Sequence, residues 1–381
     1  MSIFNSLGSN YNLSFVLKSL FSSNRLVYHS ELEQLLHNKY GGNVVLLYKG
    51  REAIELALKT LNLPEGYVAI NGFTCFAVYE AVKRAHLNLE YLDIDKGELN
   101  FSANSLEKAI QKNPKIKVVI VQNTLGYPAD IEPISKVCKQ NKIFLIEDLA
   151  HCVGTKYPNG QEAGKVGDFV VLSFSQDKMI DAVSGGALIE RIGAKLIHPP
   201  GGPDLKTQLK DRFYPIFTYL IRNTYQWKLG KILHFILKNL RFLSEPMDDL
   251  QKPHYLPAWY CSLIKFQFEK LKDNLNHRKK IALIYSSQIN PKVISPKLIS
   301  LIEFSSNLRF PIFVENRDAL IKFLDKNQIF VSDIWYDTPV APCPNAELAS
   351  DEILNLPTHI NVSELDAERI SNLINLWLKS K

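Results

Sequence analysis

Residues 143–151 read IFLIEDLAH, and residues 169–178 read FVVLSFSQDK. Each stretch begins with a run of apolar residues, which is typical of a strand buried on both faces of a parallel sheet. Asp148 ends the first strand, and Lys178 follows the second, thirty positions further along the chain. Because ligands bind at the carboxyl ends of the strands in such sheets, we expect this carboxylate and this amine to share a site.

Similar short runs recur on both sides of this pair, and helical stretches separate them. The helix expected after the first run carries Ile54, Ala57 and Leu58 on one face. This alternation predicts an α/β fold with a mostly parallel, seven-stranded sheet sandwiched by helices. The predicted strands are residues 44–48, 67–70, 89–93, 118–123, 143–148, 169–174 and 186–189.

The alternation of strands and helices stops near residue 192, and a mixed pattern of strands and helices follows further along. We therefore predict a large α/β domain over residues 1–255 and a small C-terminal α+β domain over residues 256–381. A basic helical insertion at about residues 200–250 interrupts the large domain.

Within this insertion, residues 205–243 contain eight Lys or Arg side chains and a single acid, Asp211. The apolar residues have helical spacing, which predicts an amphipathic helix with basic residues opposite its apolar stripe. Two interpretations stay open: a helix that covers the protein's own core or a dimer contact, or a surface that rests on an anionic membrane or holds a substrate diphosphate. The stripe consists of Leu229, Ile232, Leu233, Ile236, Leu237 and Leu240.

Composition excludes several classes of protein. The chain has 381 residues, of which 46% are hydrophobic and 22% charged, so it is neither a disordered chain nor a small stapled module. The net charge of +6 is mild, and the basic residues accompany an aliphatic stripe rather than stacking aromatics, so we expect no nucleic-acid partner. Five widely spaced cysteines without ligand spacing predict a reducing cytoplasm and no metal site. We also expect no signal peptide and no membrane span, which leaves a soluble or membrane-surface protein.

A third feature joins Asp148 and Lys178 at the strand ends. Gly50 and Arg51 connect the first strand to a helix, whose free amides can bind an anion. A carboxylate, a lysine and a phosphate-sized anion site are the parts needed to hold pyridoxal phosphate. The carboxylate would keep the pyridine nitrogen protonated, and the lysine would supply the Schiff base and move protons.

Taken in this order, these features resemble one family. The chain is similar to the DegT/StrS-type sugar aminotransferases, which are pyridoxal-phosphate enzymes of fold type I, the aspartate aminotransferase fold. The similarity covers about residues 25–375, with a gap over the basic insertion. The matching stretches are GREAIELAL (50–58), GFTCFAVYEAV (72–82), GYPADIEPI (126–134), IEDLAHCVG (146–154), GKVGDFVVLSFSQDKMI (164–180), SGGALI (184–189), LRFPIFV (308–314) and LNLPTHI (354–360).

The resemblance implies a homodimer that moves an amino group from L-glutamate to a keto-sugar, nucleotide-linked and destined for a surface polysaccharide or another amino-sugar product. Two alternatives remain open. One is a pyridoxal-phosphate sugar dehydratase, although that branch of the family replaces the lysine with histidine, and here Lys178 is present. The other is a catalytically silent relative with a regulatory or scaffolding role.

The resemblance also assigns roles around the cofactor ring. Lys178 would form the Schiff base and act as the general base. Asp148 would pair with the pyridine nitrogen. His151 matches the position that touches the phenolic oxygen of the cofactor.

Further positions match the phosphate and the face of the ring. Ser173 matches the phosphate-binding serine, while Gly50 and Arg51 match the pair whose amides hold the same phosphate. The aromatic residue that stacks on the ring falls near Cys75 and Phe76: gapless matching puts Cys75 in this position, and Phe76 is the nearest aromatic.

Two departures from the family pattern bear on substrate recognition. Ser184 stands where the family's Gly-Glu-Gly-Gly stretch has its glutamate. The Asn-Tyr-Arg-Met stretch, by which the partner subunit approaches the phosphate, has no clear counterpart before residue 257. The resemblance therefore names no residues contributed by the partner subunit.

Overall fold

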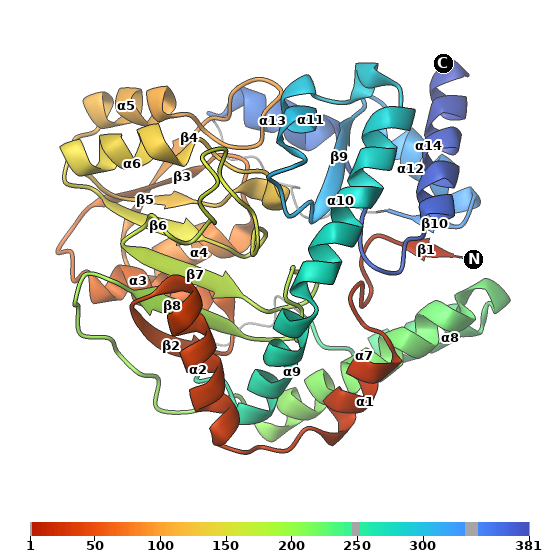
Figure 1. Ribbon diagram of the computed structural model, residues 1–381, viewed down its shortest axis with the longest axis horizontal. Helices are drawn as coiled ribbons and strands as arrows, with labels where there is room; N and C mark the ends of the chain where they lie inside the picture. The colour runs from red at the N-terminus through yellow and green to blue at the C-terminus, as the bar shows by residue number, and fades with distance from the viewer. Residues whose placement is uncertain (1, 246–251, 332–341, 381) are drawn as a thin grey trace.

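The computed structural model describes residues 2–245, 252–331 and 342–380. Its centre is a seven-stranded sheet in the order β2-β8-β7-β6-β5-β3-β4 (Figure 1). β8 runs antiparallel to both of its neighbours, and the other neighbouring pairs are parallel. The predicted mostly parallel, seven-stranded sheet is therefore confirmed. The strands are β2 (Asn43–Leu47), β3 (Tyr67–Asn71), β4 (Asn88–Leu92), β5 (Ile116–Val121), β6 (Phe144–Asp148), β7 (Phe169–Ser173) and β8 (Gly186–Glu190).

Alternate side chains of the sheet pack into different cores, because successive residues of a strand point to opposite faces. On β5, Val118 and Ile120 join the core under α3 (Gly50–Thr60) and α4 (Phe76–Arg84). Val119 and Val121 join the opposite core, which also contains residues of α2 (Val27–Tyr40), α5 (Ala103–Lys112) and α6 (Ile131–Gln140). Both faces of the sheet are thus covered, which explains why its strands read as continuous apolar runs.

A second, smaller unit lies beyond the sheet. β9 (Arg309–Phe313) and β11 (Ile353–Pro357) form an antiparallel pair. Their apolar residues share a separate core with α10 (Leu271–Gln288), α12 (Arg317–Lys326) and α14 (Glu364–Lys379). The remaining elements here are η3 (Pro291–Val293), α11 (Pro296–Leu301) and α13 (Pro344–Glu352).

At two places the elements do not follow a division of the chain into an N-terminal and a C-terminal part. β1 (Ile3–Phe4) pairs in parallel with β10 (Ile329–Phe330), so the N-terminal segment belongs to the smaller sheet unit by hydrogen bonding. α9 (Ala258–Glu269) instead packs its Trp259 and Leu263 into the core of the large sheet. The domain division at residue 255 stays a prediction.

The basic insertion forms two helices, and the second of them corresponds to the amphipathic helix that its periodicity predicts. α7 (Leu205–Thr224) and α8 (Leu229–Asn239) are joined by η2 (Tyr225–Trp227), and α1 (Leu13–Phe21) packs against α7. These helices lie at the lower right of Figure 1, away from the central sheet. Residues 246–250 of the predicted insertion lie outside the described residues. Within the described ranges, no helix is both long and apolar enough to cross a membrane.

Candidate active site

The polar residues singled out in the sequence lie at the carboxyl ends of adjacent parallel strands. Asp148 is the last residue of β6 and Ser173 the last residue of β7, and these strands are neighbours in the sheet. Both side chains are buried. Lys178 follows in the loop after β7, where its amine reaches the loop that follows β6. The sheet therefore brings together residues that lie up to thirty positions apart in the chain.

The Lys178 amine contacts His151: Nζ and Nε2 are 3.1 Å apart. On its other side, His151 Nδ1 accepts a hydrogen bond from the backbone N–H of Leu125 at 3.3 Å. A ring nitrogen that accepts carries no proton, so Nε2 is the protonated nitrogen of the neutral ring and donates to Lys178. In this tautomer the contact favours the neutral form of the Lys178 amine, which can offer a lone pair.

Burial shifts the pKa values of both groups toward their neutral forms. It lowers the pKa of the Lys178 amine, while the nearby Asp148 carboxylate opposes that shift. Burial, followed by the charge of Lys178, lowers the pKa of His151 well below 6.5. Both effects arise because a low-dielectric surrounding disfavours the charged form of a base. A neutral lysine is a nucleophile and a proton acceptor, so the pair is equipped for both kinds of chemistry.

Asp148 is a buried carboxylate with a local hydrogen bond. Its side chain is 3% exposed, and Oδ1 accepts from the backbone N–H of Ala150 at 2.9 Å. Burial raises the pKa of this carboxyl, whereas the Ala150 bond and the charge of Lys178 lower it. A buried carboxylate is costly without a cationic partner, so the site favours a ligand that places a cation beside it.

The N-terminus of α3 forms the third part of the site. A Cβ atom added to Gly50 would lie 2.6 Å from the Cβ of Ser173. Only glycine therefore allows the first turn of α3 to approach the end of β7 this closely. The arrangement places the Ser173 hydroxyl beside the start of a helix, where free amides and the helix dipole attract anions.

These residues fit pyridoxal phosphate. Gly50 and Ser173 provide a close cradle that suits a phosphate, Asp148 provides the buried carboxylate for a pyridine nitrogen, and Lys178 provides a primary amine whose pKa is lowered by burial. Arg51 lies in the first turn of α3, where its side chain also forms an ion pair with Glu80 at 3.2 Å.

The two residues offered for ring stacking lie at the start of α4. Cys75 is the residue before the helix, and its thiol is near enough to Lys178 to influence the pKa of the amine. Phe76 is 46% exposed and packs edge-on against Tyr79, with ring centroids 4.7 Å apart. A stacking role for Cys75 or Phe76 stays a prediction.

Ser184, which stands where the family has glutamate, accepts a hydrogen bond from a buried lysine. Lys49 lies directly before Gly50, is 3% exposed, and donates from Nζ to Ser184 Oγ at 3.2 Å. The Ser184 hydroxyl in turn contacts Tyr48, whose hydroxyl donates to Asp211 at 2.6 Å. Asp211, the single acid of residues 205–243, therefore points inward and contacts a residue next to the site.

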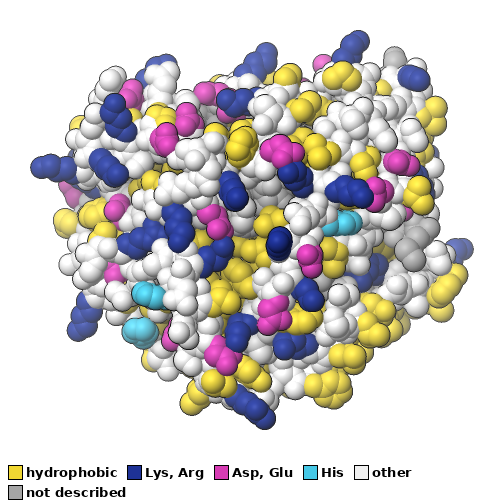
Figure 2. Space-filling view, viewed as in Figure 1, with side chains coloured by type: hydrophobic (Ala, Val, Ile, Leu, Met, Phe, Trp, Pro, Cys, Tyr) yellow, Lys and Arg dark blue, Asp and Glu magenta, His cyan; other side chains and the backbone are white. Residues whose placement is uncertain are grey.

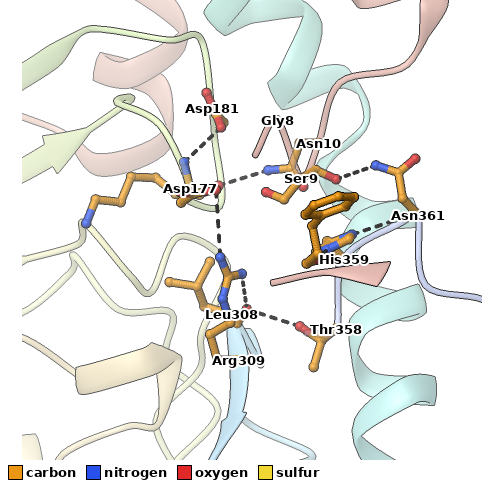
Figure 3. Close-up of polar contacts among 12 residues, drawn as sticks. Gly8, Ser9, Asn10, Asp177, Asp181, Leu308, Arg309, Thr358, His359 and Asn361 are labelled. Atoms are coloured by element: carbon orange, nitrogen blue, oxygen red, sulfur yellow. Dashed lines mark hydrogen bonds and ion pairs between the residues drawn. The ribbon is translucent and has the colours of Figure 1, made fainter. Parts of the chain in front are cut away.

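A polar network holds the Lys178 loop from behind (Figure 3). Asn10 donates to the backbone oxygen of Lys178 at 2.9 Å, and Asp177 forms an ion pair with Arg309 at 3.8 Å. Asp177 has a positive φ of 62°, and its backbone N–H donates to Asp181. The loop is thus fixed jointly by the N-terminal segment and by the first residue of β9.

Sequence reasoning did not single out these supporting residues. Arg309 carried a usable signal, because an arginine inside the apolar stretch LRFPIFV must find a buried partner. Gln122 did too: it follows the apolar run of β5, is 8% exposed, and contacts the Thr74 hydroxyl. Asn10 carried no signal, because its contact with Lys178 spans 168 positions.

Comparison with protein families gives a match over most of the chain. The model of the DegT/DnrJ/EryC1/StrS aminotransferase family matches residues 13–194 and 255–375. The unmatched residues between these ranges contain α7 and α8. The helical insertion therefore lies outside the residues that the family model matches.

Individual relatives agree with the family match. A protein named pleiotropic regulatory protein from Geobacillus stearothermophilus is 32% identical over 83% of this chain and 79% of its own length. The UDP-N-acetyl-3-dehydro-α-D-glucosamine 3-aminotransferase of Acidithiobacillus ferrooxidans is 30% identical over 86% of this chain and 82% of its own length. Among solved structures, the pyridoxal-phosphate form of a sugar aminotransferase, Spr1654 of Streptococcus pneumoniae, has a TM-score of 0.72 at 19% identity and covers 100% of this chain and 99% of its own.

Proposed function

Because the chain belongs to the DegT/DnrJ/EryC1/StrS aminotransferase family, whose members depend on pyridoxal phosphate, we propose that it transfers an amino group from L-glutamate to a nucleotide-linked keto-sugar. The product would enter amino-sugar biosynthesis for a surface polysaccharide. The observation that carries the proposal is the Lys178–His151 contact at the strand ends, beside Asp148 and the Gly50–Ser173 cradle.

Four residues would hold the cofactor. The amides at the start of α3 and the Ser173 hydroxyl would bind its phosphate. Gly50 allows these groups to lie close together, because it has no side chain to collide with Ser173. Asp148 would pair with the ring nitrogen, which relieves the cost of burying its carboxylate. His151 would donate from Nε2 to an oxygen on the ring, since its Nδ1 is occupied by the Leu125 amide. When bound, pyridoxal phosphate carries the amino group between donor and acceptor and stabilises negative charge at the reacting carbon.

Lys178 would move the proton in both halves of the reaction. Its Nζ takes a proton from the donor's α-carbon and returns one later, which requires an amine that is neutral near pH 7. The depressed pKa of Lys178 supports this role, and so does the neutral His151 that contacts it. The Asn10 and Asp177 contacts behind the loop would keep Nζ aimed at the reacting carbon.

Substrate, assembly and location belong to the same proposal. The sugar nucleotide in the name of the Acidithiobacillus relative supports a nucleotide-linked substrate here. A homodimer would cover the exposed Phe76 at the mouth of the site. The five cysteines are all free, which supports a reducing cytoplasm as the place of reaction.

The test begins with purified protein saturated with pyridoxal phosphate. We would add L-glutamate without any sugar and measure 2-oxoglutarate, which should form in an amount equal to the bound cofactor. Nucleotide-linked keto-sugars with the carbonyl at different ring carbons would then be supplied in parallel. Only the true acceptor should convert this single burst into continuous turnover.

The Lys178→Ala variant is the control for chemistry, and circular dichroism is the control for folding. The proposal would be contradicted if the parent protein is folded but binds no cofactor and releases no 2-oxoglutarate. That result would favour the silent regulatory relative, an alternative for which the name of the Geobacillus protein is the supporting observation.

A further inference from the structure

The outer face of α7 is apolar along its whole length. Four large apolar side chains follow one another here at steps of four, four and seven residues, which places them on one side of the helix. They are Leu205, Leu209, Phe213 and Leu220, which are 77%, 53%, 43% and 43% exposed. The opposite face is buried and includes Ile221. A surface helix of a soluble protein normally turns its apolar stripe toward the core and its polar residues toward water. α7 has apolar residues on both sides.

α8 repeats the pattern. A side chain at Gly230 would collide with the backbone of α7, so this residue lets the two helices pack closely. Leu237 faces the same way and is buried. Ile232 and Ile236, one helical turn apart, remain 56% and 45% exposed. The apolar stripe predicted from the sequence is therefore divided between the protein's interior and its surface.

α1 extends the same apolar surface. Arg212 of α7 donates to the backbone oxygens of Leu20 and Ser22 and so fixes α1 beside α7. On α1, Leu13 and Phe21 are 54% and 79% exposed. Figure 2 shows hydrophobic side chains with Lys and Arg among them along the lower right of the molecule, where Figure 1 places α1, α7 and α8.

The charges of this surface are predominantly basic. Residues 12–27 contain no acid, and the only acid of residues 205–243 is Asp211, which is 1% exposed and faces inward. Within these two segments no carboxylate reaches the outer face, and the exposed Asp204 just before α7 accepts from the backbone N–H of Thr207 as the helix cap. The exposed basic residues are Arg25, Lys206, Lys228, Lys231, Lys238 and Arg241.

The exposed apolar residues together with the basic charges distinguish between two possible partners of this surface, a second copy of the chain and a lipid bilayer. A second copy of the chain seated symmetrically on the same face would place basic residues against basic residues, with no exposed acid from either segment to pair them. An anionic lipid surface offers negative headgroups to the lysines and hydrocarbon to the leucines and isoleucines. We propose that the outer faces of α1, α7 and α8 dock on an anionic lipid bilayer. This docking does not depend on the amino-transfer reaction.

The experiment uses the full chain with bound cofactor and vesicles of phosphatidylcholine, with or without phosphatidylglycerol. The protein should sediment with the anionic vesicles and remain in solution with the neutral ones. Raising the salt concentration should release it, because screening weakens the attraction of lysines to headgroups. Equal binding to both vesicle types, or to neither, would overturn the proposal.

Two pairs of substitutions separate the apolar and the basic contributions. Ile232→Gln with Ile236→Gln keeps good helix formers on α8, and should weaken binding roughly tenfold. Lys231→Gln with Lys238→Gln should weaken it roughly twentyfold. The matched controls are Leu365→Gln with Leu376→Gln on α14, and Lys108→Gln with Lys112→Gln on α5, which should bind as the parent does.

Sedimentation velocity without lipid distinguishes the other occupant. If the Ile232→Gln, Ile236→Gln protein has a lower mass in solution than the parent, the surface is a contact between copies and the lipid proposal is wrong. An unchanged mass together with lost vesicle binding is the expected result. Circular dichroism should be unchanged in all four variants, since every substituted side chain is partly or fully exposed.

Discussion

Charged side chains are arranged differently around the strand-end site and on the outer side of helices α7 and α8. Behind the site, the buried Asp177 pairs with Arg309, so charge is balanced within the chain. On the outer side of α7 and α8, basic residues accumulate and the only acid of the segment is turned inward. Burial explains the difference: a charge removed from water needs a partner in the protein, whereas an exposed charge is solvated or meets a partner from outside.

α7 joins the two regions. Its inner face carries Asp211, which accepts from the Tyr48 and Tyr260 hydroxyls at 2.6 and 2.7 Å and so supports the site. Its outer face carries Leu209 and Phe213, whose side chains are 53% and 43% exposed and so lie outside the buried core of the described chain. Substitutions on the two sides should therefore have separable effects.

The largest difference should come from chemistry. Lys178→Ala removes the amine that contacts His151, and we expect turnover to fall by about a thousandfold or more. The Ile232→Gln, Ile236→Gln protein should keep its turnover in solution within about twofold, because those side chains lie on the surface. The measurement is 2-oxoglutarate formation from glutamate, with equal amounts of folded protein. Comparable losses in both proteins would mean that the two regions are not separate.

Adjacent residues on α7 sharpen the comparison of its faces. Ile221 is fully buried, and Ile221→Ala should lower the free energy of unfolding by about 3 kcal/mol through lost burial and a residual cavity. Leu220 is 43% exposed, and Leu220→Ala should cost less than about 1 kcal/mol. Urea denaturation followed by circular dichroism measures both. Equal losses would show that the outer face is buried in solution.

A smaller effect is expected at the phosphate cradle. In Gly50→Ala the new methyl group would meet Ser173, and overpacking of this kind costs about 1 to 3 kcal/mol. We expect pyridoxal phosphate to bind roughly tenfold to a hundredfold more weakly, which equilibrium dialysis measures. Gly201→Ala is the control, because no atom lies within 4 Å of its added Cβ. If the Gly50→Ala protein binds pyridoxal phosphate as tightly as the parent, the proposal that Gly50 and Ser173 form the phosphate site is wrong.

The smallest effect concerns pH. The pKa of folded His151 lies well below 6.5, so below about pH 6.5 the unfolded chain binds a proton that the folded chain does not. Stability must therefore fall as pH falls through this range. His151→Gln should reduce the loss of unfolding free energy between pH 7.5 and 5.5 by about 1 kcal/mol. Thermal or urea unfolding at these pH values checks this, with the exposed His86→Gln as control. An identical pH profile in His151→Gln would show that His151 titrates normally.

Much of the site could be predicted from the sequence. Asp148 and Lys178 stand out because the apolar runs before them define strands, and strand ends meet at one edge of a parallel sheet. Asn10 could not be found this way. Arg278 lies in the polar stretch NLNHRKK and reads as a surface residue, yet it is fully buried and donates to Asn10 and to the backbone oxygen of Leu308.

For α8 the sequence determined the helix and its apolar stripe, and nothing more. Periodicity places Leu229, Ile232, Ile236 and Leu237 on one side of α8, because that spacing is a local property of the backbone. Only the tertiary structure decided that Leu237 packs against the protein while Ile232 and Ile236 face outward. Burial depends on which distant segments come to lie against the helix, and a repeat of three and four residues contains no information about them.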